Sequence, residues 1–138
     1  MADNTFILEV VTPEHILFKD EIQFVVTPAV EGELGVLRNH APMVASLGIG
    51  VLRYTDPEGM IKRMAISGGF MEVVDNTARV LAETAEHGDE IDVLRAKASL
   101  DRAQKRIEAR EEELNFIRAQ MSLQRALARI KAAEGKLD

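Results

Sequence analysis

The pattern of hydrophobic and polar positions divides this chain of 138 residues into two parts that meet near Gly88. Up to about Glu86, apolar and polar residues alternate with period two, for example from Val51 to Thr55. Such alternation is typical of strands that bury one face. Turn-forming residues recur at short intervals: Thr12-Pro13, Pro28, Gly32 to Gly35, His40-Ala41-Pro42, Gly48 to Gly50, Asp56 to Gly59, Ser67-Gly68-Gly69 and Asp75-Asn76. No apolar period of helix length separates them, so we expect an antiparallel sandwich or barrel over residues 1–88.

From Asp89 onwards the apolar residues recur at spacings of three and four, which predicts helix over residues 89–138. Asp89 is the expected N-cap, because its side chain can accept a hydrogen bond from a free backbone N–H of the first turn. One apolar stripe comprises Val93, Ala96, Leu100, Ala103 and Ile107. A second comprises Phe116, Ala119, Leu123, Ala126, Ile130, Ala133 and Leu137. Their alanines allow helices to approach closely, although each buries little surface.

The connection between the two stripes carries no glycine or proline that would end a helix. Two arrangements therefore fit: a hairpin that turns near Glu111 to Asn115, or a nearly continuous helix from Asp89 to Glu134. The continuous helix would be roughly 69 Å long, whereas a domain of this size is about 30 Å across. It would need another protein to cover its stripe. The sequence permits both states, as a switch requires.

Charge and composition restrict the class of protein. The net charge is −6, which argues against nucleic-acid binding. The 6 basic and 13 acidic residues of 1–88 give −7, whereas 89–138 is +1, and this supports a boundary near Gly88. Cysteine is absent, no apolar run approaches the roughly 18 residues that cross a bilayer, and the N-terminus does not resemble a signal peptide. We expect a soluble protein of a reducing compartment that does not span the membrane.

Motifs for catalysis are missing. The chain has no phosphate-binding loop and no Gly-x-Ser-x-Gly elbow. Its three histidines are scattered without metal-ligand spacing. We therefore predict no catalytic residues, no metal site and no enzymatic activity of the isolated chain.

The helical part carries two rows of arginines. Arg95 and Arg102 share one helix face, and Arg118, Arg125 and Arg129 share another. In a hairpin the rows could converge, and guanidinium groups held together favour phosphate oxygens between them. The alternative is a solvated face whose arginines form salt bridges. Their partners would be Asp92, Asp101, Glu108 and Glu112.

Two segments of the first part resemble the signatures of one family. Gly32 to Val36 with His40-Ala41-Pro42, and Ser67 to Val73, are similar to those of epsilon subunits of bacterial F-type ATP synthases. The resemblance implies a β + α fold, with a flattened antiparallel β-sandwich of about ten strands over 1–88. A two-helix antiparallel hairpin over 89–138 follows, and it can extend.

The resemblance also implies a function. The sandwich would dock on the gamma subunit and the c-subunit ring, and would help to couple proton- or sodium-driven rotation to ATP synthesis in the alpha/beta head. The extended tail would inhibit ATP hydrolysis. The location would be peripheral, on the cytoplasmic face of the bacterial cell membrane. Glu33 and His40 would be partner contacts, because this region of the family faces the rotor.

A third segment, Ile91 to Ala96, resembles the Ile/Leu-Asp-x-x-Arg-Ala motif of family members that bind ATP on the folded tail. The resemblance implies ATP as a regulatory ligand, with or without magnesium, and no prosthetic group. The implied ATP-binding residues are Glu86, Ile91, Asp92, Arg95, Ala96, Arg102, Arg118, Arg125 and Arg129. An alternative remains open, in which the protein is a structural rotor adaptor whose tail does not sense nucleotide.

Overall fold

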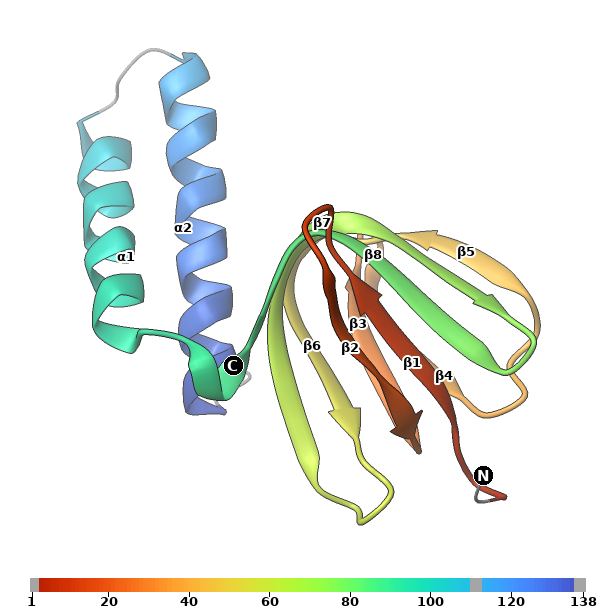
Figure 1. Ribbon diagram of the computed structural model, residues 1–138. Coiled ribbons are helices and arrows are strands. Elements are labelled where there is room, and N and C mark those ends of the chain that lie inside the picture. The colour runs from red at the N-terminus through yellow and green to blue at the C-terminus, as the bar shows by residue number, and fades with distance from the viewer. Residues whose placement is uncertain (1–2, 110–112, 136–138) are drawn as a thin grey trace.

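The computed structural model describes residues 3–109 and 113–135, except for the side chains of residues 113 and 114. Within them, a β-rich part is followed by a helical hairpin (Figure 1). The strands are β1 (Phe6–Val11), β2 (Ile16–Ile22), β3 (Phe24–Ala29), β4 (Gly32–Leu37), β5 (Met43–Ser46), β6 (Ile49–Thr55), β7 (Ile61–Val74) and β8 (Thr77–His87). The helical elements are the 3-10 turn η1 (Gly88–Glu90), α1 (Val93–Glu108) and α2 (Glu113–Glu134). Neither α-helix, over the ranges described, is long and apolar enough to span a membrane.

The strands hydrogen-bond in the order β2-β1-β8-β7-β6-β3-β4, and β5 pairs with β7. The pairing differs from the expected antiparallel arrangement at one place, because β1 runs parallel to β8. The two strands are distant in the sequence, since Ile7 of β1 pairs with Thr77 of β8, so they do not form a hairpin. The described residues form eight strands instead of about ten, since β7 has 14 residues and β8 has 11 and each continues through the bend of the sheet.

The bend in β7 lies at Gly68-Gly69, where the sequence suggested a turn between strands. Residues 61–67 of β7 pair with β6, and residues 70–73 pair with β5, so the two halves belong to different layers. Gly68 and Gly69 have φ values of 69° and 110°, which favour glycine. A Cβ at Gly69 would lie 2.0 Å from the carbonyl oxygen of Leu81. The glycines therefore fold one strand over instead of ending it.

The hydrophobic core lies between the two layers of the sandwich. Its largest fully buried side chains are Phe6, Leu8, Val10, Ile22, Val25, Val36, Leu52, Met64, Ile66, Met71, Val73 and Val80. Tyr54 of β6 is also buried, and its ring centroid lies 4.7 Å from that of Phe18. Burial is the main reason why the pKa of Tyr54 rises to about 12. The predicted β-sandwich is confirmed.

The tail is folded as a hairpin, with α2 between α1 and the sheet (Figure 1). Of the two predicted stripes, Ala96 and Ala103 of α1 and Ala119 and Ala126 of α2 are buried. Leu137 lies outside the described residues, as do residues 111 and 112 of the predicted turn, and residues 113–115 already belong to α2. Ala128 and Ala132 form a second buried face of α2, which the stripes did not include.

The helical part begins later than the sequence suggested. Asp89 belongs to the turn η1, and the N-cap of α1 is Asp92, whose carboxylate accepts a hydrogen bond from the backbone N–H of Arg95 at 3.0 Å. The buried side chain of Ile91 separates the turn from the helix. The chain changes direction between β8 and α1 at residues 88–91, so α1 starts after this turn and Asp92, the next aspartate, caps it.

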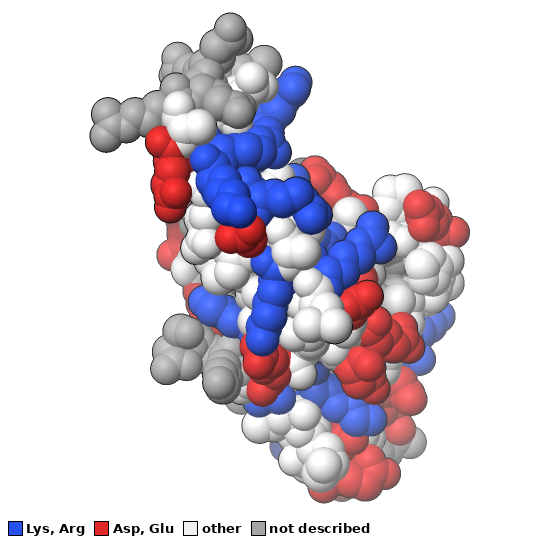
Figure 2. All heavy atoms as spheres, turned by 90° about the vertical axis from the view of Figure 1, so that its left-hand side faces the viewer, with Lys and Arg blue, Asp and Glu red and all other residues white. Residues whose placement is uncertain are grey.

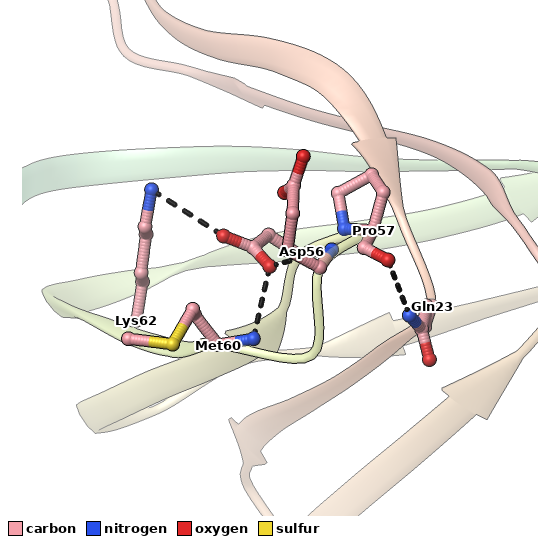
Figure 3. Close-up of polar contacts among 6 residues, drawn as sticks. Gln23, Asp56, Pro57, Met60 and Lys62 are labelled. Atoms are coloured by element: carbon pink, nitrogen blue, oxygen red, sulfur yellow. Dashed lines mark hydrogen bonds and ion pairs between the residues drawn. The ribbon is translucent and has the colours of Figure 1, made fainter.

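The turn between β6 and β7 is closed by the carboxylate of Asp56 (Figure 3). Its Oδ1 accepts hydrogen bonds from the backbone N–H groups of Met60 at 2.9 Å and Glu58 at 3.0 Å. Lys62 Nζ lies 3.6 Å from the other oxygen. The hydrogen bond from Met60 is the main cause that holds the pKa of Asp56 below its ordinary value of 3.8.

We predict that Asp56→Asn makes stability less dependent on pH. Because the folded pKa of Asp56 lies below 3.8, its ionised form stabilises the fold above that pH, and this contribution is lost as the pH falls through the folded pKa. Wild type should be more stable than the variant at neutral pH, and the difference should shrink in acid. Urea unfolding at a series of pH values measures it. As a control, Glu58→Gln removes a charge from the same turn and should not reproduce the effect. A difference in unfolding free energy between wild type and Asp56→Asn that stays the same at every pH would contradict the prediction.

Candidate functional site

A cavity of about 450 Å³ lies where the end of β8, the start of α1 and one face of α2 meet. Its lining residues are Glu86, Glu90, Ile91, Asp92, Arg95, Ala96, Ser99 and Arg129. Six of the nine residues implied as ATP-binding by the resemblance are among them. The folded hairpin thus brings together residues that lie more than forty positions apart in the sequence.

Each element contributes a different kind of group to this cavity. Arg95 and Ser99 lie one turn apart on α1, and Asp92 closes the start of that helix through its hydrogen bond to the N–H of Arg95. Glu86 comes from the end of β8. Arg129 of α2 donates from Nε to Oε1 of Glu86 over 2.6 Å, and this ion pair joins the tail to the sandwich.

The remaining predicted arginines lie around the cavity rather than on its wall. Arg125 lies in the narrow space beside Glu86 and Arg129, and its Nη2 donates to Ser122 at 3.3 Å. Arg102 donates from Nη2 to the hydroxyl of Ser99 at 3.0 Å, so its guanidinium lies next to a lining residue without lining the cavity itself. Arg118 is exposed on α2 and does not line the cavity.

Two residues of the cavity were not predicted. Ser99 lies four positions after Arg95, hence on the same helix face, so the arginine spacing could have indicated it. Glu90 belongs to the 3-10 turn, where the expected helix gave no reason to place it beside Asp92. Its position depends on the turn between β8 and α1, which the sequence pattern did not specify.

The surface of the hairpin carries a gathering of lysine and arginine side chains, as Figure 2 shows. Within the part of the chain that the structure describes, no ion pair joins Arg95, Arg102, Arg118 or Arg125 to an acidic side chain. Only Arg129 has such a partner among the five arginines. Guanidinium groups that are not engaged in ion pairs can bind phosphate or carboxylate oxygens, and here Arg95 lies beside the carboxylates of Glu86, Glu90 and Asp92. Arg95 on the cavity wall and Arg125 beside it are therefore the groups that can receive an anion.

The two predicted partner-contact residues lie elsewhere. Glu33 of β4 forms an ion pair with Arg53 of β6 at 2.5 Å and lines a hollow of about 560 Å³ between β3, β4 and β5. His40 follows β4, and its Nδ1 lies 2.7 Å from the carbonyl oxygen of Ala41. His40 does not line that hollow. Over residues 3–109 and 113–135, no group of three or more His, Asp and Glu side chains is arranged to hold a metal ion.

Comparison with known families decides the class of protein. Residues 5–88 match the model of the beta-sandwich domain of the ATP synthase delta/epsilon chain, and residues 89–134 match that of its long alpha-helix domain. The chain belongs to the ATP synthase delta/epsilon chain family. This membership confirms the resemblance and makes the chain a non-catalytic stalk subunit.

Relatives within the delta/epsilon chain family are close. An ATP synthase epsilon chain of Syntrophomonas wolfei is 70% identical over 81% of this chain and 82% of the relative. One of Carboxydothermus hydrogenoformans is 53% identical over 80% of this chain and 81% of the relative.

The fold also occurs in solved complexes. A chain of the Euglena gracilis mitochondrial ATP synthase has a TM-score of 0.81 at 23% identity, over 98% of this chain and 82% of that one. A chain of the Tetrahymena thermophila mitochondrial ATP synthase central stalk and c-ring has a TM-score of 0.57 at 13% identity, over 92% and 95%. At these identities the likeness concerns the fold.

The ion pair between Arg129 and Glu86 should stabilise this delta/epsilon chain modestly. The two side chains are 33% and 44% exposed, so Glu86→Gln should lower the free energy of unfolding by only about 0.5–1 kcal/mol. The loss should shrink at high salt because ions screen the pair. Urea unfolding at low and high salt measures both effects.

A matched control is Asp101→Asn, which breaks the pair with Lys105 on the outer face of α1. These side chains are 62% and 74% exposed, so the loss should be about 0–0.5 kcal/mol. If Glu86→Gln loses no more stability than this control, the ion pair does not hold the tail.

Proposed function

We propose that this chain is an epsilon subunit of the central stalk of a bacterial ATP synthase, and that its helical tail inhibits ATP hydrolysis unless ATP holds it against the sandwich. The sandwich would help to couple proton- or sodium-driven rotation to ATP synthesis in the alpha/beta head. Names of relatives up to 70% identical support the subunit assignment. The protein would act on the cytoplasmic face of the cell membrane without spanning it.

The observation that carries the ATP proposal is the cavity beside the hairpin. Arg95 of α1 and Arg129 of α2 line this cavity together with Glu86, and Arg125 lies in the adjoining space. The triphosphate would lie among the arginines. The apolar side chains of Ile91 and Ala96, both buried at the cavity wall, would face the less polar base. Magnesium could accompany the phosphates, since the protein need not supply its own ligands for it.

Regulation would follow from the site being made of two elements that separate when the tail extends. ATP that binds only the folded hairpin lowers the free energy of that state and leaves the extended state unchanged. At a concentration one hundred times its dissociation constant, it would stabilise the folded state by about 2.7 kcal/mol, or roughly one hundredfold in population. This range suffices for a switch if the two states are otherwise of similar free energy.

A second function, the rotor adaptor with a nucleotide-blind tail, is favoured by a different observation. Two of the implied ATP-binding residues already have structural roles without any ligand. Asp92 caps α1, and Arg129 is paired with Glu86. In the adaptor these contacts would be their whole purpose, and ATP would leave the tail unaffected.

Docking on the rotor would use the hollow that Glu33 lines. Val30 and Val44 lie in the same hollow, and each is 69% exposed. Apolar side chains gathered with a charged residue at a surface hollow are typical of a protein interface. We propose the gamma subunit and the c-subunit ring as the partners that cover it, with His40 at the edge of the contact.

Calorimetry of ATP binding to the isolated chain separates the two functions. Arg125→Ala and Arg129→Ala should each weaken ATP binding by about tenfold or more, because each removes a charge-assisted hydrogen bond to phosphate. Arg79→Ala is the matched control, since Arg79 lies on β8 and pairs with Glu9, away from the cavity. Wild-type affinity in both cavity variants would reject the site and favour the adaptor.

The inhibitory role is tested in the assembled synthase. A chain that ends at Gly88 lacks the tail but keeps every strand of the sandwich. It should assemble normally, and ATP hydrolysis should rise severalfold relative to wild type. Co-purification with the other subunits controls for assembly. Unchanged hydrolysis in a fully assembled complex would show that the tail is not an inhibitor.

A further inference from the structure

At Gly88 the backbone comes very close to that of α2. A Cβ at this position would lie 2.4 Å from the carbonyl oxygen of Ala132 and 3.1 Å from that of Arg63. The φ angle of Gly88 is outside the left-handed region, so its backbone conformation is open to any residue. Glycine is needed there because space is lacking, and the space is occupied by backbone on both sides.

A side chain at Gly88 would displace α2 rather than the sheet. Arg63 belongs to β7, which pairs with β6 on one side and with β8 on the other. The backbone of β7 is therefore held by two ladders. Ala132 lies in the last turn of α2, whose fully buried side chains against the sheet are the alanines Ala128 and Ala132. The helix can shift at a lower free-energy cost than the central strand.

Arg63 also contacts the end of α2 through its side chain. Its Nη1 lies 3.2 Å from where a Cβ of Gly135 would be. Gly135 has a φ of 73° and its N–H donates to the carbonyl of Lys131 at 2.8 Å, so it ends the helix. A guanidinium at this place interacts favourably with the negative end of the helix dipole. Arg63 and Gly88 thus hold the same turn of α2, from two sides.

That turn sets the position of an arginine of the cavity. Ala132 lies three residues after Arg129 on α2, and Gly88 lies two residues after Glu86, so the close contact at Gly88 is adjacent to the ion pair between those two side chains. We propose that Gly88 is a positioning residue. By bringing the last turn of α2 against the backbone of the sandwich, it fixes Arg129 against Glu86 and keeps the tail folded.

The test uses distances between spin labels in the full-length chain, which has no cysteine of its own. Labels at Gln120 on α2 and Glu72 on β7 report on the tail, and labels at Glu58 and Glu72 report on the sandwich; all three residues are exposed. Gly88→Ala should raise the population with a lengthened tail distance about tenfold or more, as expected for an overpacked contact. The sandwich distance should not change.

The matched control is Gly48→Ala, which also adds one methyl group to the sandwich. A Cβ there would lie 3.8 Å from the carbonyl oxygen of Pro28, an ordinary contact, so both distances should stay as in wild type. A wild-type tail distance in Gly88→Ala would overturn the proposal. A change of the sandwich distance in that variant would overturn it too, because Gly88 would then be a general folding residue.

ATP affinity gives a second measurement, which rests on the proposed function. Gly88→Ala should weaken ATP binding about tenfold, because Arg129 is misplaced, while Gly48→Ala should not. If wild type binds no ATP, the proposed ligand is wrong, and the label distances still decide the role of Gly88. If wild type binds ATP and Gly88→Ala binds it equally well, the positioning role is rejected although the proposed function stands.

Discussion

The close approach of α2 to the sheet is the constraint on which the structure of the tail depends. The fully buried contacts between helix and sheet are made by Ala65, Ala128 and Ala132, with Ile49, Val51 and Ile130 partly buried beside them. At Gly88 the backbone of the turn lies close to the backbone of α2. Larger side chains at these places would hold α2 away from β7 and β8. Arg129 would then not reach Glu86, and the cavity between the hairpin and the sandwich would lose one wall.

The same constraint keeps the tail separable from the sandwich. Each buried methyl or methylene contributes only about 0.8 kcal/mol, so an interface whose fully buried helix residues are alanines is weak for its length. The buried residues between tail and sheet also form a cluster distinct from the core of the sandwich. Release of the tail, as proposed above, would therefore leave that core covered. In such a weak interface, one ion pair or one bound anion would change the balance between the docked state and the proposed released state appreciably.

Much of this architecture could be predicted from the sequence, because period and composition report on local structure. Alternation predicted the strands, and the spacing of alanines predicted the facing sides of both helices. The glycines at 68 and 69 were interpreted as a turn, although they bend β7 in its middle. A glycine pair specifies an unusual backbone, but whether the chain then reverses depends on strands that pair from distant parts of the sequence.

The face formed by Ala128 and Ala132 was missed for a related reason. Alanine is common in helices whether exposed or buried, so a second alanine face is no signal until the partner surface is known. The cap of α1 was also misplaced from Asp92 to Asp89, since both aspartates precede an apolar run. Only the turn that β8 makes into α1 distinguishes them. Both the second buried face of α2 and the N-cap of α1 thus depend on contacts between residues that are distant in the sequence.

The arginine spacing had two interpretations, salt bridges or an anion site, and each describes some of the arginines in the structure. Arg129 forms a salt bridge, but with Glu86 of the sheet instead of an acid of the tail, and Arg95, Arg102 and Arg125 lie near it without carboxylate partners among the described residues. Positive charges gathered in this way repel one another to the extent that Glu86, Glu90 and Asp92 at the same cavity do not offset them. An anion would relieve it only in the folded state. In the proposed ATP-binding tail, the electrostatic cost of closing the hairpin would thus also favour a bound phosphate.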